Sequence, residues 1–185
     1  MNVYRLNPDG EHFQSLVLKN RDDWSLVSAI VEGRNPLSEW LPFEVSVLRD
    51  PKIASPELPP GDFPFLSPLD VFSARAVKAL ADILGQNGAL LPLRCDEGEY
   101  FVFVATNVID ALDLSRSKVW ELDTGRVVRI EEYAFEPEAL NDQVLFRLVQ
   151  RPWCETYVTD AFVDRVRSAD LIGFQFPLLW TKMHK

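Results

Sequence analysis

The sequence predicts an α+β fold, with an antiparallel-rich sheet, two main helices and an N-terminal layer that contains strands. Two observations lead to this prediction. Short strand patterns follow one another through tight turns, which is typical of antiparallel hairpins. Helical spacing of apolar residues occurs in only two segments, about 73–85 and 159–169, so strands and helices do not alternate as they do in a parallel βαβ sheet.

Prolines divide the chain. Six of the 13 prolines fall within residues 51–68, where missing N–H donors and a restricted backbone exclude a regular helix or a central strand. We therefore predict an extended connector over residues 51–68 that lies against the surface. It would join an N-terminal layer, residues 1–50, to a main body, residues 69–185, within one compact unit.

The N-terminal layer contains one clear strand pattern. Phe43, Val45 and Val47 alternate on one face of residues 42–48, as in a half-buried strand. The other features expected in this layer are two short strands and two anchoring tryptophans: 3–6, 15–19, Trp24 and Trp40.

Each predicted helix follows a capping residue and carries one apolar stripe. Ser73 precedes the first helix and Thr159 the second, and both hydroxyl groups suit an N-cap. Apolar residues then recur every three or four positions, which defines the face turned to the core. The stripe residues are Ala76, Val77, Leu80, Ile83 and Leu84 in the first helix, and Phe162, Val163, Val166 and Ala169 in the second.

Strand patterns in the main body pair into two hairpins. The first joins 89–95 to 100–105, and the second joins 117–123 to 126–135 through the turn Asp123-Thr124-Gly125. The apolar run at 100–104 does not alternate, so this strand should be covered on both faces. Further strands are predicted at 69–73, 144–149 and 172–176, the last with Ile172, Phe174 and Phe176 on one face.

The composition favours a protein that acts by binding another protein. The net charge is −9, which opposes nucleic-acid binding and suits a basic protein partner. The first residues lack the pattern of a signal peptide, and no apolar run is long enough for a transmembrane helix, so we expect a cytoplasmic protein. We expect no cofactor and no metal, because the chain has two cysteines, Cys95 and Cys154, and two histidines, His12 and His184.

Two aspartates stand three residues apart, at Asp110 and Asp113. Such a pair can hold a divalent cation or share acid–base work. Aspartate at a strand end also tightens turns, and this structural interpretation is the preferred one. The enzymatic alternative is a small metal-dependent enzyme that uses both carboxylates.

Acidic side chains also gather at two expected turns or strand ends. Asp96, Glu97 and Glu99 occupy the tip of the first hairpin, and Glu131 and Glu132 lie on the second. Exposed clusters of one sign can steer association with a basic partner. We therefore predict these five residues as the interface with a protein partner.

Several phrases of the second half occur together in one known family. They are PLDVFSARAVKAL, LLPLRC, VIDALDLSRSKV, VLFRL and YVTDAFVDRVRSADLIGFQFPLLW. In this order and spacing, residues 60–180 resemble family eleven of the immunity proteins of bacterial polymorphic-toxin systems. No family motif is found in the first 60 residues.

The resemblance implies a role without catalysis. Such a protein binds and neutralises a cognate toxin, which a contact-dependent or type VI secretion system often delivers. Because the protein is expected in the cytoplasm, the toxin should act there, as a nuclease or nucleotide-modifying enzyme does. A further alternative is an adaptor with no toxin partner. The motif residues Asp110, Asp113, Phe146, Arg147, Gly173 and Phe174 are interpreted as scaffold, with Arg147 pairing with Asp110 or Asp113.

Overall fold

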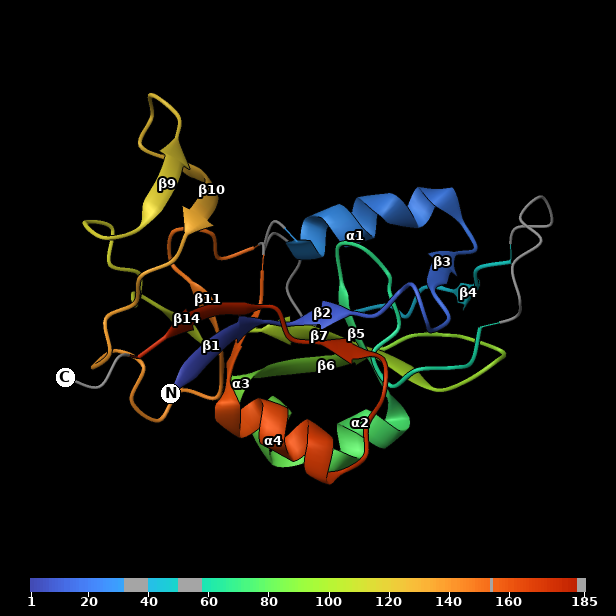
Figure 1. Ribbon diagram of the computed structural model, residues 1–185. Coiled ribbons are helices and arrows are strands. Elements are labelled where there is room, and N and C mark those ends of the chain that lie inside the picture. Colours follow the sequence, from blue (N-terminus) through green and yellow to red (C-terminus); the bar gives the residue numbers. More distant parts are fainter. Residues whose placement is uncertain (32–39, 50–57, 154, 183–185) are drawn as a thin grey trace.

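Figure 1 shows the computed structural model, which describes residues 1–31, 40–49, 58–153 and 155–182. The predictions made for residues 50–57, for Cys154 and for His184 lie outside these ranges. Within them, antiparallel sheets combine with four α-helices, which confirms the α+β class.

The largest sheet joins the two ends of the described chain. Its strand order is β14-β1-β12-β11-β8, and all neighbours are antiparallel except β11 and β8. The first residues therefore lie inside the sheet, between two strands from the end of the sequence. The bounds are Asn2–Arg5 for β1, Val108–Ile109 for β8, Leu145–Leu148 for β11, Tyr157–Thr159 for β12 and Leu178–Thr181 for β14.

A second sheet has β7 (Tyr100–Ala105) between β5 (Asp70–Ser73) and β6 (Gly88–Pro92), with both pairings antiparallel. Val102 and Phe103 face different core clusters, and both are fully or almost fully buried. Covering of β7 on both faces, expected from its unbroken apolar run, is thus confirmed.

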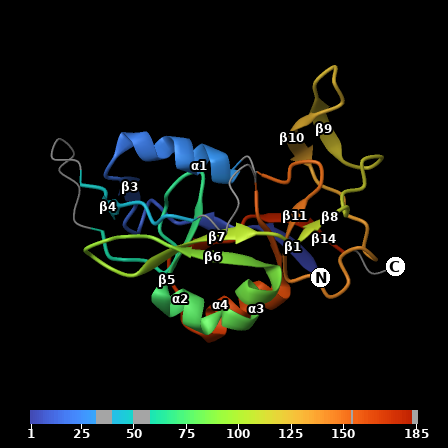
Figure 2. The ribbon, with the colours of Figure 1, turned by 180° about the vertical axis from the view of Figure 1, so that it is seen from behind.

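Helices cover both sides of these sheets (Figures 1 and 2). The helices α2 (Ala74–Ala79), α3 (Ala81–Asn87) and α4 (Asp160–Ser168) lie on one side. On the other side lies α1 (Trp24–Val31), which the short 3₁₀ helix η1 (Arg21–Asp23) precedes and which the sequence did not predict.

The two predicted helix starts differ in their caps. The Ser73 hydroxyl accepts a hydrogen bond from the Ala76 N–H, as expected of an N-cap. Thr159 stands at the N-cap position of α4, but its hydroxyl donates to the carbonyl of Gln143, so the predicted side-chain cap is wrong. Leu80 departs from helical geometry, with φ −110° and ψ 13°, and this divides the first predicted helix into α2 and α3.

Three two-stranded sheets complete the fold. The predicted hairpin at 117–135 is present as β9 and β10, and Gly125 turns it with φ +78°. The pairs are β3 (Leu16–Leu18) with β4 (Val45–Val47), β9 (Lys118–Glu121) with β10 (Val127–Glu132), and β2 (Asn7–Pro8) with β13 (Phe174–Gln175).

The two tryptophans and the last predicted strand differ in how well their predicted burial agrees with the structure. Trp40 donates its indole N–H to the Pro92 carbonyl and packs edge-on against Phe43, which confirms it as an anchor. Trp24 is 50% exposed, so its predicted anchoring role is wrong. Ile172 is also exposed, because the chain turns at Gly173 before β13 begins.

Asp62 fixes the described end of the proline-rich connector to the body. Its buried carboxylate accepts hydrogen bonds from the Ser73 hydroxyl, the Arg75 guanidinium and the Ile172 N–H. The neighbouring Phe63 ring stacks on Phe174 at 5.0 Å between centroids. This part of the connector is therefore built into the core and does not merely lie on the surface.

Gly173 stands where a side chain cannot be accommodated without strain. Its φ is +86°, and a Cβ atom there would lie 3.3 Å from the Gly61 Cα. Left-handed backbone favours glycine, because any other L-residue crowds its own carbonyl.

We expect Gly173→Ala to lower the free energy of unfolding by about 1–2 kcal/mol. Chemical denaturation monitored by circular dichroism would measure the change. The matched control is Gly85→Ala in α3, where an added Cβ meets no atom within 4 Å. That variant should instead stabilise the protein by up to about 1 kcal/mol. Equal effects at the two positions would contradict the backbone argument.

Candidate interaction surface

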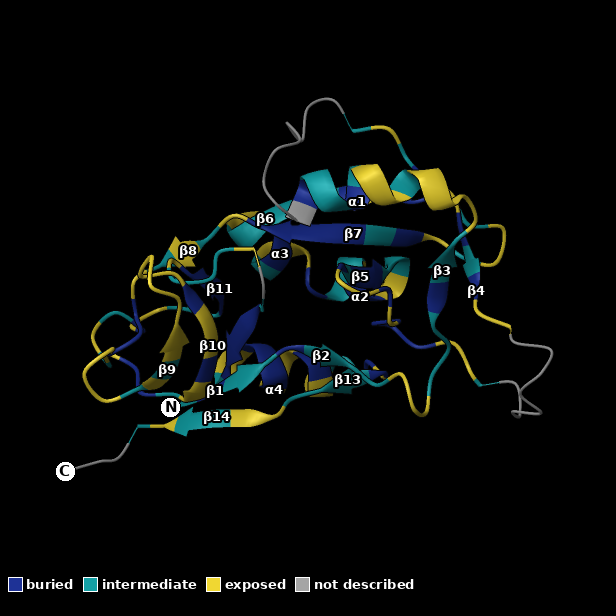
Figure 3. Ribbon diagram, turned by 90° about the horizontal axis from the view of Figure 1, so that it is seen from above, coloured by how far each residue is buried: buried dark blue, intermediate teal, exposed yellow. Residues whose placement is uncertain are grey.

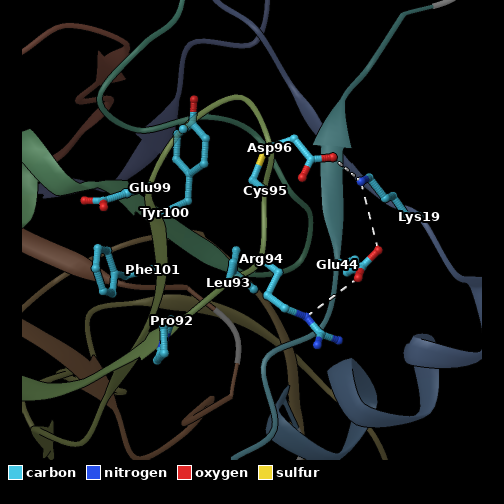
Figure 4. A pocket seen from close by; sticks show the side chains of 11 residues that line it. Lys19, Glu44, Pro92, Leu93, Arg94, Cys95, Asp96, Glu99, Tyr100 and Phe101 are labelled. Atoms are coloured by element: carbon cyan, nitrogen blue, oxygen red, sulfur yellow. Dashed lines mark hydrogen bonds and ion pairs between the residues drawn. The ribbon is translucent and has the colours of Figure 1, made fainter.

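The first predicted acidic group, Asp96, Glu97 and Glu99, belongs to a loop that is hydrogen-bonded to the N-terminal layer. The loop follows β6, and its Arg94 exchanges backbone hydrogen bonds with Phe43 and Val45 beside it, at 3.0 and 2.9 Å. This junction borders a pocket of about 480 Å³. Figure 4 shows its lining side chains, most of which come from the loop, from β7 and from Glu44, the residue before β4.

Two of the three acidic residues in this loop form ion pairs within the protein. Asp96 pairs with Lys19 at 2.7 Å, as Figure 4 shows. Glu97 pairs with Arg49 and also accepts the Val47 N–H, and its pKa is lowered chiefly by the Arg49 hydrogen bond. Both carboxylates therefore fasten the loop to the β3–β4 sheet. Glu99 is exposed and forms no ion pair within the described part of the chain.

The second acidic group lies at the other end of the molecule, on the β9–β10 hairpin (Figures 1 and 2). Glu131 pairs with Lys118 across the hairpin at 2.8 Å, and this hydrogen-bonded pair lowers the pKa of the glutamate. Glu132 is exposed, and no ion pair of its carboxylate is found among the described residues. The predicted interface residues thus form two separate surfaces.

Asp113 organises a turn. One carboxylate oxygen accepts hydrogen bonds from the Ser115 hydroxyl at 2.6 Å and from the backbone N–H groups of Ser115 and Arg116. The other oxygen accepts from the Arg116 guanidinium. These bonds, with that of the Ser115 hydroxyl first, hold the pKa of Asp113 far below its usual range.

Asp110 has a different partner. Its exposed carboxylate accepts a hydrogen bond from the Gln150 amide at 2.8 Å. Asp110 and Asp113 therefore use their carboxylates on different partners. Over the ranges that the structure describes, no group of three or more histidine, cysteine or acidic residues is placed to hold a metal ion.

Arg147 does not pair with either of these aspartates, so that hypothesis is wrong. Its guanidinium lies 3.8 Å from the Asp70 carboxylate of β5 and donates to the Thr156 hydroxyl. The reason is strand alternation: Leu145 and Arg147 face the three-stranded sheet, whereas Phe146 faces the cluster that contains Ala111 and Leu112. Burial raises the pKa of Asp70, although Arg147 opposes the rise.

Trp120 is a surface residue that the sequence analysis did not single out. It is 63% exposed, beside the exposed Leu122 and Val128 on the same hairpin. Alternation could have identified it, because its neighbour Val119 pairs with the buried Ile130, which directs Trp120 outward.

Comparison with known proteins found one family whose model matches part of the chain. Residues 94–178 match the model of the Immunity protein family (Imm11), which spans the two hairpin strands, β11, α4 and the turn at Gly173. The resemblance seen in the sequence is thereby confirmed over this segment, and it indicates an immunity role that consists of binding a toxin. No curated protein matches the chain. None of the described helices is long and apolar enough to cross a membrane.

We expect Arg147→Met to lower the free energy of unfolding by about 3–5 kcal/mol, because Asp70 would remain buried without its counter-charge. A double-mutant cycle with Asp70→Asn, read by denaturant unfolding, should show strong coupling. The same cycle between Arg147 and Asp113 is the control. Coupling in the control cycle, and none in the first, would refute the pairing seen here.

The lowered pKa of Asp113 predicts a pH dependence. A carboxylate with a folded-state pKa below its unfolded value, about 3.9, contributes stability above that value and loses it as the pH falls toward the folded pKa. Asp113→Asn should therefore lower the melting temperature at pH 7, and the deficit should shrink below about pH 4. Asp110→Asn serves as the control, and a deficit that stays constant over this range would contradict the prediction.

Proposed function

We propose that this protein is an antitoxin that binds and neutralises a cognate polymorphic toxin acting in the cytoplasm, without catalysing a reaction. The observation that carries the proposal is the match of residues 94–178 to the Immunity protein family (Imm11). The toxin would be one made by the same cell or its kin and delivered by a contact-dependent or type VI secretion system. Cys95 is a free thiol, which suits a reducing compartment such as the cytoplasm.

The charge of the protein supports a basic partner. A net charge of −9 gives a field that attracts cationic surfaces over several ångströms. A toxin that cuts nucleic acid or modifies nucleotides needs basic groups to hold phosphates. An acidic inhibitor is complementary to such a surface, which favours a nuclease or a nucleotide-modifying enzyme as the target.

The five predicted interface residues are not equivalent in this role. Asp96, Glu97 and Glu131 already pair with Lys19, Arg49 and Lys118. Reversing their charges would disturb the fold as well as any interface. Glu99 and Glu132 form no ion pair within the described ranges, so their charges are the ones that a partner can use.

The proposal is tested by co-expression. Each large open reading frame next to this gene is expressed alone and together with the protein. We expect one product to arrest growth alone, to be tolerated on co-expression, and to co-purify in a 1:1 complex. Cell fractionation should place the complex in the cytoplasm. If every neighbouring product is harmless, or if toxicity persists despite co-expression, the antitoxin proposal is wrong.

The charge argument makes a separate prediction. The double variant Glu99→Lys, Glu132→Lys should slow association with the toxin about tenfold or more at low salt, and the difference should shrink as salt rises, because screening removes steering. Stopped-flow or surface plasmon resonance would measure the rates. The matched control is Asp164→Lys on α4, an exposed acid that likewise forms no ion pair within the described chain. An association rate that is insensitive to both salt and variant would contradict the prediction.

A further inference from the structure

The β9–β10 hairpin stands away from the body (Figures 1 and 2), and exposed residues lie on both of its strands (Figure 3). It forms a sheet of its own, whose two strands pair only with each other within the described chain. Its inner side is fixed to the core, because Val127 and Ile130 are buried in the cluster that contains Phe135. The hairpin is therefore anchored through its inner side and free on its outer side.

Large apolar side chains are exposed on this hairpin. Trp120, Leu122 and Val128 are 63%, 50% and 40% exposed. Single exposed apolar residues are common on any protein, and Trp24 on α1 is one. Three on one short hairpin, with a tryptophan among them, expose apolar area where nothing in the fold covers it. Such clusters mark interaction surfaces, and tryptophan is the residue most enriched among binding hot spots.

Charged groups surround the tryptophan. Arg129 stands opposite Trp120 in the strand register, and Lys118, two residues before Trp120, pairs with Glu131. Asp123 and Glu132 form no ion pair among the described residues. The result is an apolar centre with unpaired acids at its rim, which is the usual anatomy of a protein interface.

We infer that the outer face of the β9–β10 hairpin is the toxin-binding surface, with Trp120 as its anchor. This inference rests on the proposed antitoxin function and specifies where the partner binds. The partner must offer an apolar pocket for the indole ring, edged by basic side chains that pair with Asp123 and Glu132. The hairpin lies wholly within residues 94–178, the segment that matches the immunity family.

The test uses the toxin identified by co-expression with the neighbouring open reading frames, and the full-length protein. Trp120→Ala should weaken binding about 30-fold or more and abolish growth rescue, since truncating a hot-spot tryptophan costs at least that factor. The matched control is Trp24→Ala, the same substitution at an exposed tryptophan on α1, which should leave the dissociation constant unchanged. Both tryptophan variants should keep the wild-type melting temperature. Leu122→Asp is a second variant of the hairpin, and it should also weaken binding.

Photo-crosslinking gives a direct readout. A benzophenone amino acid at position 120 should crosslink to the toxin, and one at position 24 should not. Binding of Trp120→Ala at wild-type strength, with no crosslink from position 120, would overturn the inference while the antitoxin function stands. If no neighbouring product binds the wild type, the antitoxin proposal and the binding-face inference are both overturned. If ultracentrifugation shows a wild-type dimer that Trp120→Ala dissociates, the face binds a second copy, and the inference is again overturned.

Discussion

The buried contact between Asp70 and Arg147 is the constraint on which the arrangement of the two main sheets depends. Asp70 begins β5 of the three-stranded sheet, and Arg147 lies within β11 of the five-stranded sheet. The Thr156 hydroxyl joins them, since it accepts from the guanidinium and donates to the carboxylate at 2.6 Å. A buried carboxylate is tolerated only with such partners, so the two sheets must meet at this point for either charge to be compensated.

Other acidic residues act in the same manner at other junctions. Asp62 joins the connector to α2 and to the segment before β13. Asp160, at the start of α4, accepts hydrogen bonds from Asn2 and from the Tyr4 hydroxyl, which holds β1 between β14 and β12. Asp113 closes the turn that precedes β9. A part of the acidic excess therefore stabilises the fold, and only the remaining carboxylates can act on a partner.

The molecule thus consists of a body held by long-range contacts and an exposed hairpin. The body is held by long-range contacts between segments far apart in the sequence, whereas β9 and β10 pair locally and project outward. Interface residues placed on such a projection can be changed at little cost to the core. That arrangement makes the binding tests above interpretable, because loss of binding and loss of folding can be measured apart.

The sequence by itself determined the local elements. The Ser73 cap, the doubly covered β7 and the turn at Gly125 follow from hydrogen-bonding groups and spacings within a few residues, which do not depend on the rest of the chain. The family resemblance likewise came from short phrases in a fixed order. The sequence did not predict β14 or the helix α1, because both are short and gain their stability from packing.

Only the tertiary structure decided which distant side chains meet. Arg147 and Asp113 belong to neighbouring family phrases, yet strand alternation turns Arg147 toward Asp70, which is 77 positions away. In the same way, the acids at 96 and 97 proved to be paired with Lys19 and Arg49. Pairing between distant side chains depends on which surfaces come together when apolar area is buried, and that is a property of the whole chain that no local pattern encodes.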